Sequence, residues 1–337
     1  MNEPPLKVSV VCAWYNRAEY LADTVNSLLS QNFNSFEIVL VNDGSTDPRV
    51  KQILDSYEDA RLRVIHQENT GFVIAIRRAI ESSRGEYIAV QGAGDVSLPG
   101  RLKAQIDALD ADPSLCGVAC RRYRTTIGGP ADGQRSESEI VPDYVDHDYL
   151  LNHDNPINHG DTTFRRSAYN SVGGYRPFFK FAQDIDLFIR MARNSRFRIL
   201  SDIYYDRRVF FADGIANNRP KMVLQRALLE FAKQCERDRK EFGQDLLEAY
   251  GPAGALFNGA TRRKVSRFIA VIAIQYTALG NPVSALHYSK LALSQSISTT
   301  TVLARATALA GNSALLGRAI QSLLWLHPKR ATWSEKN

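Results

Sequence analysis

The residues that follow the apolar run Tyr87–Val90 form a glycine-rich turn with one carboxylate. From residue 85 the chain reads GEYIAVQGAGDVSLPGR, so Gly92 and Gly94 flank Ala93, and Asp95 follows. Because glycine has no side chain, backbone N–H groups in such a turn can approach phosphate oxygens. A hard divalent cation needs several oxygen ligands, so one aspartate is a poor site for it. The turn also lacks the third glycine of a dinucleotide-binding fingerprint, which excludes a dehydrogenase of that kind.

Two other apolar runs end in residues that could do chemistry. The run Val8–Ala13 is followed by Trp-Tyr-Asn at 14–16, and FEIVLV is followed by Asn-Asp-Gly-Ser at 42–45. Parallel sheets bind ligands outside the carboxyl ends of their strands. We therefore expect Tyr15, Asp43 and the glycine-rich turn to lie at one edge of a sheet.

Alternating strands and helices must position these residues. Apolar runs of strand length alternate with segments in which apolar residues recur at helical spacing, a pattern typical of a mostly parallel sheet with helices on both faces. The expected strands are 8–13, 36–41, 61–67 and 85–91, and the expected helices are 19–31, 48–57, 71–82 and 102–110. The sequence predicts an α/β fold in this part of the chain.

The pattern changes near residue 216. Before it, 128–139 is a polar, glycine-rich loop that we expect to be mobile, and 197–210 reads as a late strand. Beyond it only helical patterns follow, so we expect an α/β domain over 1–215 and an all-α region over 216–337. The net charge of +6 is uneven, because 216–337 carries 17 Lys and Arg against 7 Asp and Glu.

Other features bear on the compartment. The first residues lack the basic and apolar regions of a signal peptide, and no apolar run reaches the roughly 18 residues of a membrane span. The four cysteines show neither a disulfide framework nor a zinc pattern. We therefore expect a cytoplasmic protein with reduced thiols, and no nucleic acid partner.

Several segments, in order, resemble family 2 glycosyltransferases of the GT-A fold, of the type that builds bacterial surface polysaccharides. The similarity begins with VSVVCAWYNRAEYLADTVNSLLSQNFNSFEIVLVNDGSTD and continues through NTGFVIAIRRAIESSRGEYIAV and GAGDVSLPGRL. It resumes at FRRSAYNSVGGYRPFFKFAQDIDLFIRMA, so it covers roughly residues 6–212. Several motifs in the right order are far more specific than one. The resemblance implies a GT-A domain and transfer of a sugar from a nucleotide diphosphate-sugar to a hydroxyl.

The resemblance also implies a nucleotide site. It places Tyr15 against the base, and an aromatic ring suits that role because every base has a π-face. Asp43 of the Asn42-Asp43 pair would accept a hydrogen bond from the base, which suits an imide N–H such as that of uracil. UDP is therefore the favoured nucleotide, with GDP and dTDP open. The alternative is that Tyr15 is core and Asp43 caps a turn.

FAQDIDLFIRMA matches the segment that supplies the catalytic base in this family, which makes Asp184 the expected base. It would take the acceptor hydroxyl's proton while the diphosphate leaves from the opposite face, so the anomeric configuration would invert. Asp186 is the competing residue, with a structural role expected. Gly174 would let backbone approach a sugar, and His159 is a candidate acceptor or diphosphate ligand.

The chain departs from the family at two places that concern a metal. Relatives carry Asp-Ala-Asp-Asp where this chain has Gly92 to Asp95, and many carry Arg-x-His where it has Arg208-Val209-Phe210. The missing residues are metal ligands in the family, so we expect no tightly bound metal and no other cofactor, with Mg²⁺ or Mn²⁺ as the alternative. Arginines would then hold the diphosphate. The candidates, in order, are Arg207 and Arg208, then Arg165 and Arg166. Asp95 would bond a donor-sugar hydroxyl or cap the helix near Pro99.

The expected function is an inverting glycosyltransferase with a glycan or lipid-linked glycan acceptor. The alternative is a non-catalytic sugar-nucleotide-binding protein, for which the missing aspartates argue. For the C-terminal region the alternatives are contact with an anionic membrane surface on the inner face of the cell membrane, a homo-oligomer interface or a helical cap. Arg262-Arg263-Lys264 and Arg267 beside the apolar stretch Phe268–Ile274 favour the membrane surface.

Overall fold

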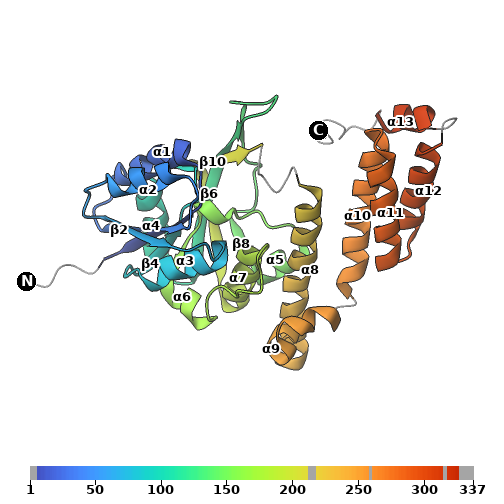
Figure 1. Cartoon of the computed structure of the whole chain (residues 1–337). Helices are drawn as coiled ribbons and strands as arrows, with labels where there is room; N and C mark the ends of the chain where they lie inside the picture. Colours follow the sequence, from blue (N-terminus) through green and yellow to red (C-terminus); the bar gives the residue numbers. More distant parts are fainter. Residues whose placement is uncertain (1–5, 212–217, 258–259, 314–316, 326–337) are drawn as a thin grey trace, which may run out of the picture. The chain divides into compact units, whose positions relative to one another are not determined.

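The computed structural model describes residues 6–211, 218–257, 260–313 and 317–325. The chain divides into two compact units, Met1–Ala212 and Asp213–Asn337 (Figure 1). The boundary expected after residue 215 falls outside the described residues.

A mixed sheet forms the centre of the first unit. Its order is β3-β2-β1-β4-β9-β6-β10-β5, with β7 beside β6 and β8 beside β10. The strands β3, β2, β1 and β4 are mutually parallel, as the alternation of strands and helices predicts. By contrast, β9 runs antiparallel to both β4 and β6. The strands are β1 (Val8–Trp14), β2 (Phe36–Asp43), β3 (Leu62–Gln67), β4 (Tyr87–Val90), β5 (Val96–Ser97), β6 (Leu115–Ile127), β7 (Arg135–Glu137), β8 (Tyr144–Asp146), β9 (Thr163–Arg165) and β10 (Arg196–Phe210).

Helices cover this sheet and bury its central strands completely. All seven residues of β1 are buried, and since a strand turns alternate side chains to opposite faces, both faces must be covered. The even-numbered side chains of β1 pack with residues of α1, α2 and α4, and α3 also packs against β1 and β2. The helices are α1 (Ala18–Leu29), α2 (Pro48–Asp55), α3 (Phe72–Glu81), α4 (Arg101–Ala111), α5 (His147–Asn152), α6 (Arg166–Ser171) and α7 (Gln183–Met191), with short 3-10 helices η1 (His159–Asp161) and η2 (Ala192–Asn194).

The long strand β6 is an element that the sequence pattern does not predict. Its first half, Leu115–Cys120, is buried, but its second half is the polar run RRYRTTI and is only partly buried. Such a run has no clear alternation, so tertiary pairing with β10 decides its structure. The segment 128–139 also differs from the mobile loop that we expected, because Arg135–Glu137 pairs with Tyr123–Thr125 as β7.

The second unit is entirely helical in its described residues. Its core is formed by side chains of α10, α11 and α12, with residues of α8 packed against it. The helices are α8 (Arg219–Phe242), α9 (Leu246–Tyr250), η4 (Gly251–Phe257), α10 (Ala260–Ala278), α11 (Pro282–Gln295), α12 (Thr299–Gly311) and α13 (Gly317–Trp325).

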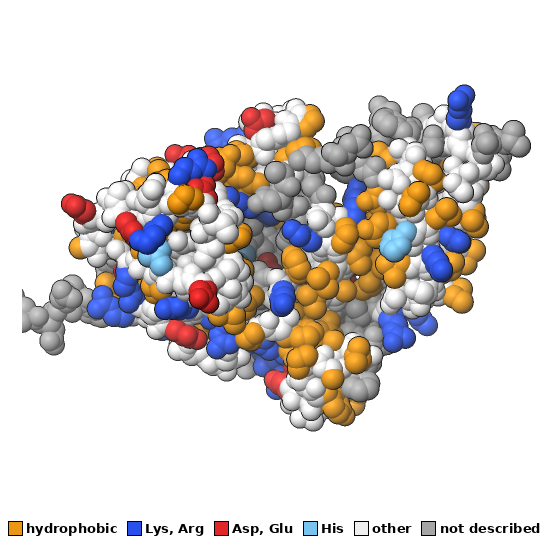
Figure 2. All heavy atoms as spheres, viewed as in Figure 1, with side chains coloured by type: hydrophobic (Ala, Val, Ile, Leu, Met, Phe, Trp, Pro, Cys, Tyr) orange, Lys and Arg blue, Asp and Glu red, His pale blue; other side chains and the backbone are white. Residues whose placement is uncertain are grey.

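This core corrects one expectation. Within the stretch Phe268–Ile274, the side chains of Ile269, Ala270, Ile272 and Ala273 are buried in the helical unit, so they are not available to a membrane surface. Other apolar side chains remain exposed on α8, α9 and α12, and Figure 2 shows hydrophobic side chains gathered over these helices. Among the described helices none combines the length and apolar character that crossing a membrane requires.

Candidate functional site

The loop after β1 leaves the sheet through a strained backbone that the loop after β2 holds in place. Asn16 and Arg17 both have positive φ, 54° and 58°. The side-chain oxygen of Asn16 accepts N–H bonds from Thr46 at 2.9 Å and Asp47 at 3.2 Å. Tyr15, just before this clamp, keeps 46% of its side chain exposed at the edge of the sheet. Sequence reasoning overlooked Asn16, although asparagine is a residue type that tolerates the left-handed region.

Asp43 is almost fully buried at the end of β2, and its carboxylate is tied to the start of α3. Oδ1 accepts bonds from Gln67 Nε2 at 2.7 Å and from Thr70 N and Oγ1 at 2.9 and 3.0 Å. Oδ2 accepts one bond, from Gly71 N at 2.9 Å. Asp43 therefore does cap a turn, and within the described residues its Oδ2 accepts a single hydrogen bond.

The amide of Asn42 is engaged within the protein at both ends. Its Nδ2 lies 3.0 Å from Nδ1 of His66, and its Oδ1 accepts the N–H of Ser45 at 3.2 Å. The structure therefore makes Asn42 a support of the turn after β2 rather than a group presented to a ligand.

Asp95 joins the glycine-rich turn to strand β10. Its Oδ2 accepts the hydroxyl of Tyr205 and its Oδ1 accepts the backbone N–H of Arg208, both at 2.8 Å. Burial raises the pKa of Asp95, and these two bonds oppose that rise. The prediction that Asp95 caps the following helix is wrong, because α4 begins after Gly100 and no side chain caps its first turn. With both oxygens engaged inside the protein, Asp95 holds the turn in place.

The two glycines lie where larger residues would collide with the site itself. A Cβ on Gly92 would overlap Oδ2 of Asp95 and approach the Tyr205 hydroxyl at 3.1 Å. Gly94 has φ +95°, and a Cβ there would lie 2.7 Å from Cζ of Phe210. The two departures from the family pattern, far apart in the sequence, therefore touch in the structure. The groups nearest to a side chain added at these two positions are thus the Asp95 carboxylate and the Phe210 ring.

The arginines named from sequence lie in different places. The Arg208 guanidinium binds Asp23 of α1 at 2.8 Å, and only its backbone reaches Asp95. Arg207 is exposed, and its charge lowers the pKa of Asp95 against the effect of burial. The structure does not bring Arg165 and Arg166 to the turn, because they bind backbone carbonyls of Leu115 and Gly85 at 2.8 and 2.6 Å.

The short helix η1 connects this turn to the expected base. Gly160 lies against Asp95 and Tyr205, so close that a Cβ would stand 2.5 Å from the Tyr205 hydroxyl. The preceding residue, His159, has Nε2 2.5 Å from the Tyr175 hydroxyl. Burial lowers the pKa of His159, and the negative charge of Asp184 opposes this. The helix η1 therefore contacts the glycine-rich turn through Gly160 and lies within the electrostatic reach of Asp184 through His159.

Asp184 lies in the first turn of α7, directly after Ala182 and Gln183. Ala182 has positive φ, 57°, a conformation that costs a non-glycine residue about 1–2 kcal/mol. Within the described part of the chain, the side chain of Asp184 makes no hydrogen bond or ion pair. Its carboxylate is partly exposed and therefore available to a ligand.

Asp186 is buried on the same helix and has a different environment. It pairs with Arg176, and its Oδ2 accepts from Arg190 Nη2 at 2.7 Å. Arg190 also donates to the carbonyl of Gly174 at 2.8 Å, so this cluster fastens the loop before α7. The group that approaches Gly174 closely is the ring of Tyr169, at 2.5 Å from a Cβ placed there.

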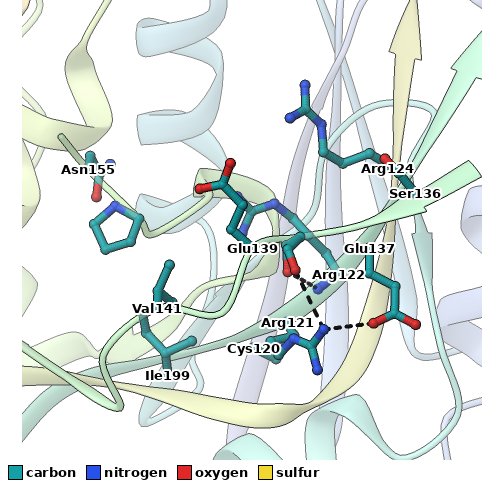
Figure 3. A pocket seen from close by; sticks show the side chains of 12 residues that line it. Cys120, Arg121, Arg122, Arg124, Ser136, Glu137, Glu139, Val141, Asn155 and Ile199 are labelled. Carbon is teal, nitrogen blue, oxygen red and sulfur yellow. Dashed lines mark hydrogen bonds and ion pairs between the residues drawn. The ribbon is translucent and has the colours of Figure 1, made fainter.

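A pocket of about 400 Å³ lies beside η1, along the second half of β6 (Figure 3). Arg122 lines it and contacts the buried Asp161 of η1 at 3.4 Å. Burial raises the pKa of Asp161 to about 6. Arg121 pairs with Glu137 in the same wall, as Figure 3 shows. The pocket is polar and charged, which suits a hydrophilic ligand.

The residues present do not fit a divalent metal. No three His, Cys, Asp or Glu side chains of the described ranges come together as metal ligands would. At the turn itself Gly92 and Gly94 offer no side-chain oxygen, Asp95 is engaged, and Phe210 is apolar. We therefore derive no catalytic step through a metal.

Comparisons with known proteins agree with this architecture. A family model described as glycosyl transferase family 2 matches residues 9–173. EpsE of Bacillus subtilis, which carries a glycosyltransferase name, is 31% identical over 199 residues, covering 56% of this chain and 68% of EpsE. TuaG of the same organism, which carries the name of a teichuronic acid biosynthesis glycosyltransferase, is 37% identical over 109 residues, covering 32% of this chain and 42% of TuaG.

Two solved structures share the fold. Residues 1–349 of Staphylococcus aureus TarS in complex with UDP-GlcNAc match with a TM-score of 0.56 at 18% identity, covering 90% of this chain and 91% of that one. The mannosyltransferase PcManGT of Pyrobaculum calidifontis, in complex with GDP-Man and Mn²⁺, matches with a TM-score of 0.56 at 19% identity, covering 98% and 84%. The α/β unit thus has the GT-A fold that the resemblance implied.

We predict that Asp186→Ala lowers the free energy of unfolding of the α/β unit by about 3–5 kcal/mol, because it leaves the buried guanidinium of Arg190 and the partly buried guanidinium of Arg176 without this carboxylate. Urea denaturation would measure this, with the exposed residue Asp148 changed to Ala as the control. An Asp186→Ala protein as stable as the control would contradict the structural role.

Proposed function

This chain belongs to glycosyl transferase family 2, and on that premise we propose that it is an inverting enzyme acting without a tightly bound metal. It moves a sugar from a nucleotide diphosphate-sugar to a hydroxyl of a glycan or glycolipid. The observation that carries the proposal is the contact between Gly94 and Phe210. Family members have metal ligands at these two positions, and in this chain both positions have changed and the two residues pack together.

The nucleotide end of the donor lies at the carboxyl ends of the neighbouring strands β1 and β2. The exposed ring of Tyr15 offers a face for base stacking. Oδ2 of Asp43 accepts one internal hydrogen bond and can accept a second from an imide N–H, which favours uracil. The TarS structure contains UDP-GlcNAc and the PcManGT structure contains GDP-Man. The favoured nucleotide of the donor is therefore UDP, and GDP is the second candidate.

Asp184 is the general base. Its carboxylate takes the proton of the acceptor hydroxyl while that oxygen bonds to the anomeric carbon and the bond to the diphosphate breaks. Attack from the face opposite the leaving group inverts the configuration. The absence of an internal hydrogen-bond partner for Asp184, among the described residues, leaves its lone pairs available for this step.

The acceptor belongs to surface polysaccharide synthesis. TuaG bears the name of such a pathway. Two residues that line the charged pocket beside η1, Asn155 and Pro156, shortly precede His159 in the sequence. We place the hydroxyl-rich acceptor in this pocket. Polar side chains there can bond sugar hydroxyls.

The rival function is sugar-nucleotide binding without turnover, and Asp184 separates the two. We predict that Asp184→Asn lowers the rate of sugar transfer or donor hydrolysis by about 10²–10⁴-fold while leaving nucleotide affinity unchanged, because only the base is lost. Activity would be measured with a panel of nucleotide sugars, and affinity by titration calorimetry, with the exposed Asp107→Asn as the control. If Asp184→Asn and Asp107→Asn had the same activity and the same nucleotide affinity, Asp184 would not be a catalytic base and the binding function would be favoured.

We predict that donor turnover persists in excess EDTA and gains little from Mg²⁺ or Mn²⁺, since the turn supplies no metal ligands. The same panel of donors measures this, and the anomer of the product, read by proton NMR, tests inversion. Activity lost in EDTA and restored by Mn²⁺ would overturn the metal-free mechanism.

For residues 216–337 we propose electrostatic contact with an anionic membrane surface. Arg262, Arg263 and Arg267 are exposed at the start of α10, whereas Lys264 pairs with Glu230 at 3.1 Å. Exposed basic residues are attracted to anionic lipid by about 1 kcal/mol each. Self-association and a capping role are the alternatives.

We predict that the protein floats with vesicles containing anionic lipid, that salt releases it, and that changing these three arginines to Gln abolishes flotation. Neutral vesicles are the control. No salt-sensitive binding would exclude the membrane role, and light scattering would then test self-association.

A further inference from the structure

A basic cluster lies at the pocket beside η1, and we define it as Arg122 and Arg124 of β6 with Arg207 of β10. Arg122 and Arg124 both line the pocket and stand two residues apart on one strand, so their side chains leave the same face. In the parallel pairing of β6 with β10, Arg124 is the register partner of Arg207, and Arg122 is that of Tyr205. The three arginines therefore share the face from which the Tyr205 hydroxyl reaches Asp95.

On the opposite face of this strand pair the charged side chains have partners within the protein. Asp206 of β10 accepts a hydrogen bond from the Thr125 hydroxyl at 2.7 Å and pairs with Arg135 of β7 at 2.9 Å. The Arg135 guanidinium also stacks on the Tyr123 ring, 3.7 Å from its centre. The two faces of the same strands thus treat charge differently.

The basic cluster is compensated only in part. Arg122 contacts the buried carboxylate of Asp161 at 3.4 Å, and its Nε is buried without a hydrogen-bond partner. The side chains of Arg124 and Arg207 are exposed, and within the described ranges neither makes a hydrogen bond or an ion pair. Desolvation lowers the pKa of Arg124, and the positive charges of Arg207 and Arg122 lower it further. These guanidinium groups therefore repel one another.

The acidic residues of the pocket do not remove this repulsion. Glu137 is already paired with Arg121, at 2.7 Å. The carboxylate of Glu139 lines the pocket and opposes the fall in the pKa of Arg124, but among the described residues no ion pair joins it to the basic cluster (Figure 3). The pocket therefore retains positive charge that a ligand could neutralise.

We propose that the acceptor carries an acidic group, a carboxylate or a phosphate, and that Arg124 and Arg122 bind it with Arg207 beside them. The proposal rests on the transfer function and on the acceptor position proposed above. The basic cluster determines which acceptors are used, whereas Asp184 takes the proton of the reacting hydroxyl. No bond of the acidic group forms or breaks, so it serves recognition alone.

An anion suits the basic cluster better than an uncharged sugar does. A guanidinium donates two parallel N–H bonds to a carboxylate or a phosphate, and such bonds are about twice as strong as those between neutral groups. An anion also offsets the repulsion between neighbouring guanidinium groups, which a hydroxyl leaves in place. The basic cluster thus selects for charge rather than for the hydroxyl pattern of one sugar.

The donor diphosphate is the competing anion in this part of the protein. Among the described residues that line the pocket, none belongs to the turn 92–95. Arg124 and Arg122 line the pocket, and Arg207 is the member of the basic cluster whose charge reaches Asp95. We therefore assign Arg124 to the acceptor, and the experiment fills the donor site with nucleotide to separate the two anions.

The test measures sugar binding to the full chain saturated with UDP, or with GDP if the donor panel identifies a GDP-sugar. The probes are methyl glucuronide, methyl glucoside 6-phosphate and methyl glucoside, which share one ring and differ at its sixth carbon. Ligand-observed NMR detects weak binding of each. The two charged sugars should bind about 10-fold more tightly than the neutral one, because hydrogen bonds to charged groups are the stronger. Comparing the carboxylate with the phosphate identifies the preferred anion.

Three variants test the residues. Arg124→Gln should reduce the preference for charged sugars by roughly 10-fold and leave the affinities for methyl glucoside and UDP unchanged. Arg124→Lys should be intermediate, because it keeps the charge without the planar fork. Glu139→Gln should increase the preference, because it removes a carboxylate that acts on Arg124. Arg122 is left intact, since its loss would leave the buried Asp161 unpaired and destabilise the protein.

Arg84→Gln is the matched control. It removes the same charge from an exposed arginine that precedes the amino end of β4, whereas the pocket lies along the carboxyl-terminal half of β6. It should change none of these affinities.

Three results would overturn the proposal. The first is that the charged sugars bind no more tightly than methyl glucoside, and the second is that their preference survives in Arg124→Gln. The third is a loss of UDP affinity in Arg124→Gln, which would place this arginine at the donor diphosphate. None of these measurements depends on turnover. Transfer that is unchanged in Asp184→Asn would instead reject the enzymatic function, so the two failures are distinguishable.

Discussion

The buried carboxylate of Asp95 is the interaction on which the arrangement of the site depends. A carboxylate removed from water needs hydrogen-bond donors, and Asp95 finds them in the Tyr205 hydroxyl and the Arg208 N–H. Both donors belong to β10, so the turn after β4 is held against that strand. The positions of Gly94 against Phe210 and of Gly160 against Tyr205 follow from this attachment.

The helix η1 carries that attachment toward the catalytic residue. Its three residues face three different parts of the site. Gly160 packs on the turn, Asp161 meets Arg122 at the pocket, and His159 bonds to Tyr175 within the electrostatic reach of Asp184. A short, tightly packed element can therefore relate the donor turn, the pocket and the base, because each of its residues is fixed by a separate contact.

Backbone strain accompanies this arrangement. In the described ranges the non-glycine residues with positive φ are Asn16, Arg17 and Ala182. The first two follow Tyr15, and the third precedes Asp184 by two residues. Local hydrogen bonds to the loop after β2 compensate the first pair, and the buried cluster around Asp186 holds the loop before α7. The strained backbone at these points gives Tyr15 and Asp184 orientations that a regular strand or helix would not give them.

The sequence by itself determined the strands β1 to β4 and the helices between them, because apolar periodicity follows directly from burial on one or both faces. It also placed Tyr15, Asp43 and the glycine-rich turn at strand ends, and it identified the family. Only the tertiary structure decided the strand β6, the engagement of Asn42, the role of Asp95 as a clamp and the contact between Gly94 and Phe210. These depend on partners far away along the chain, and a local pattern of residue types does not specify which distant side chain will occupy the space beside a glycine.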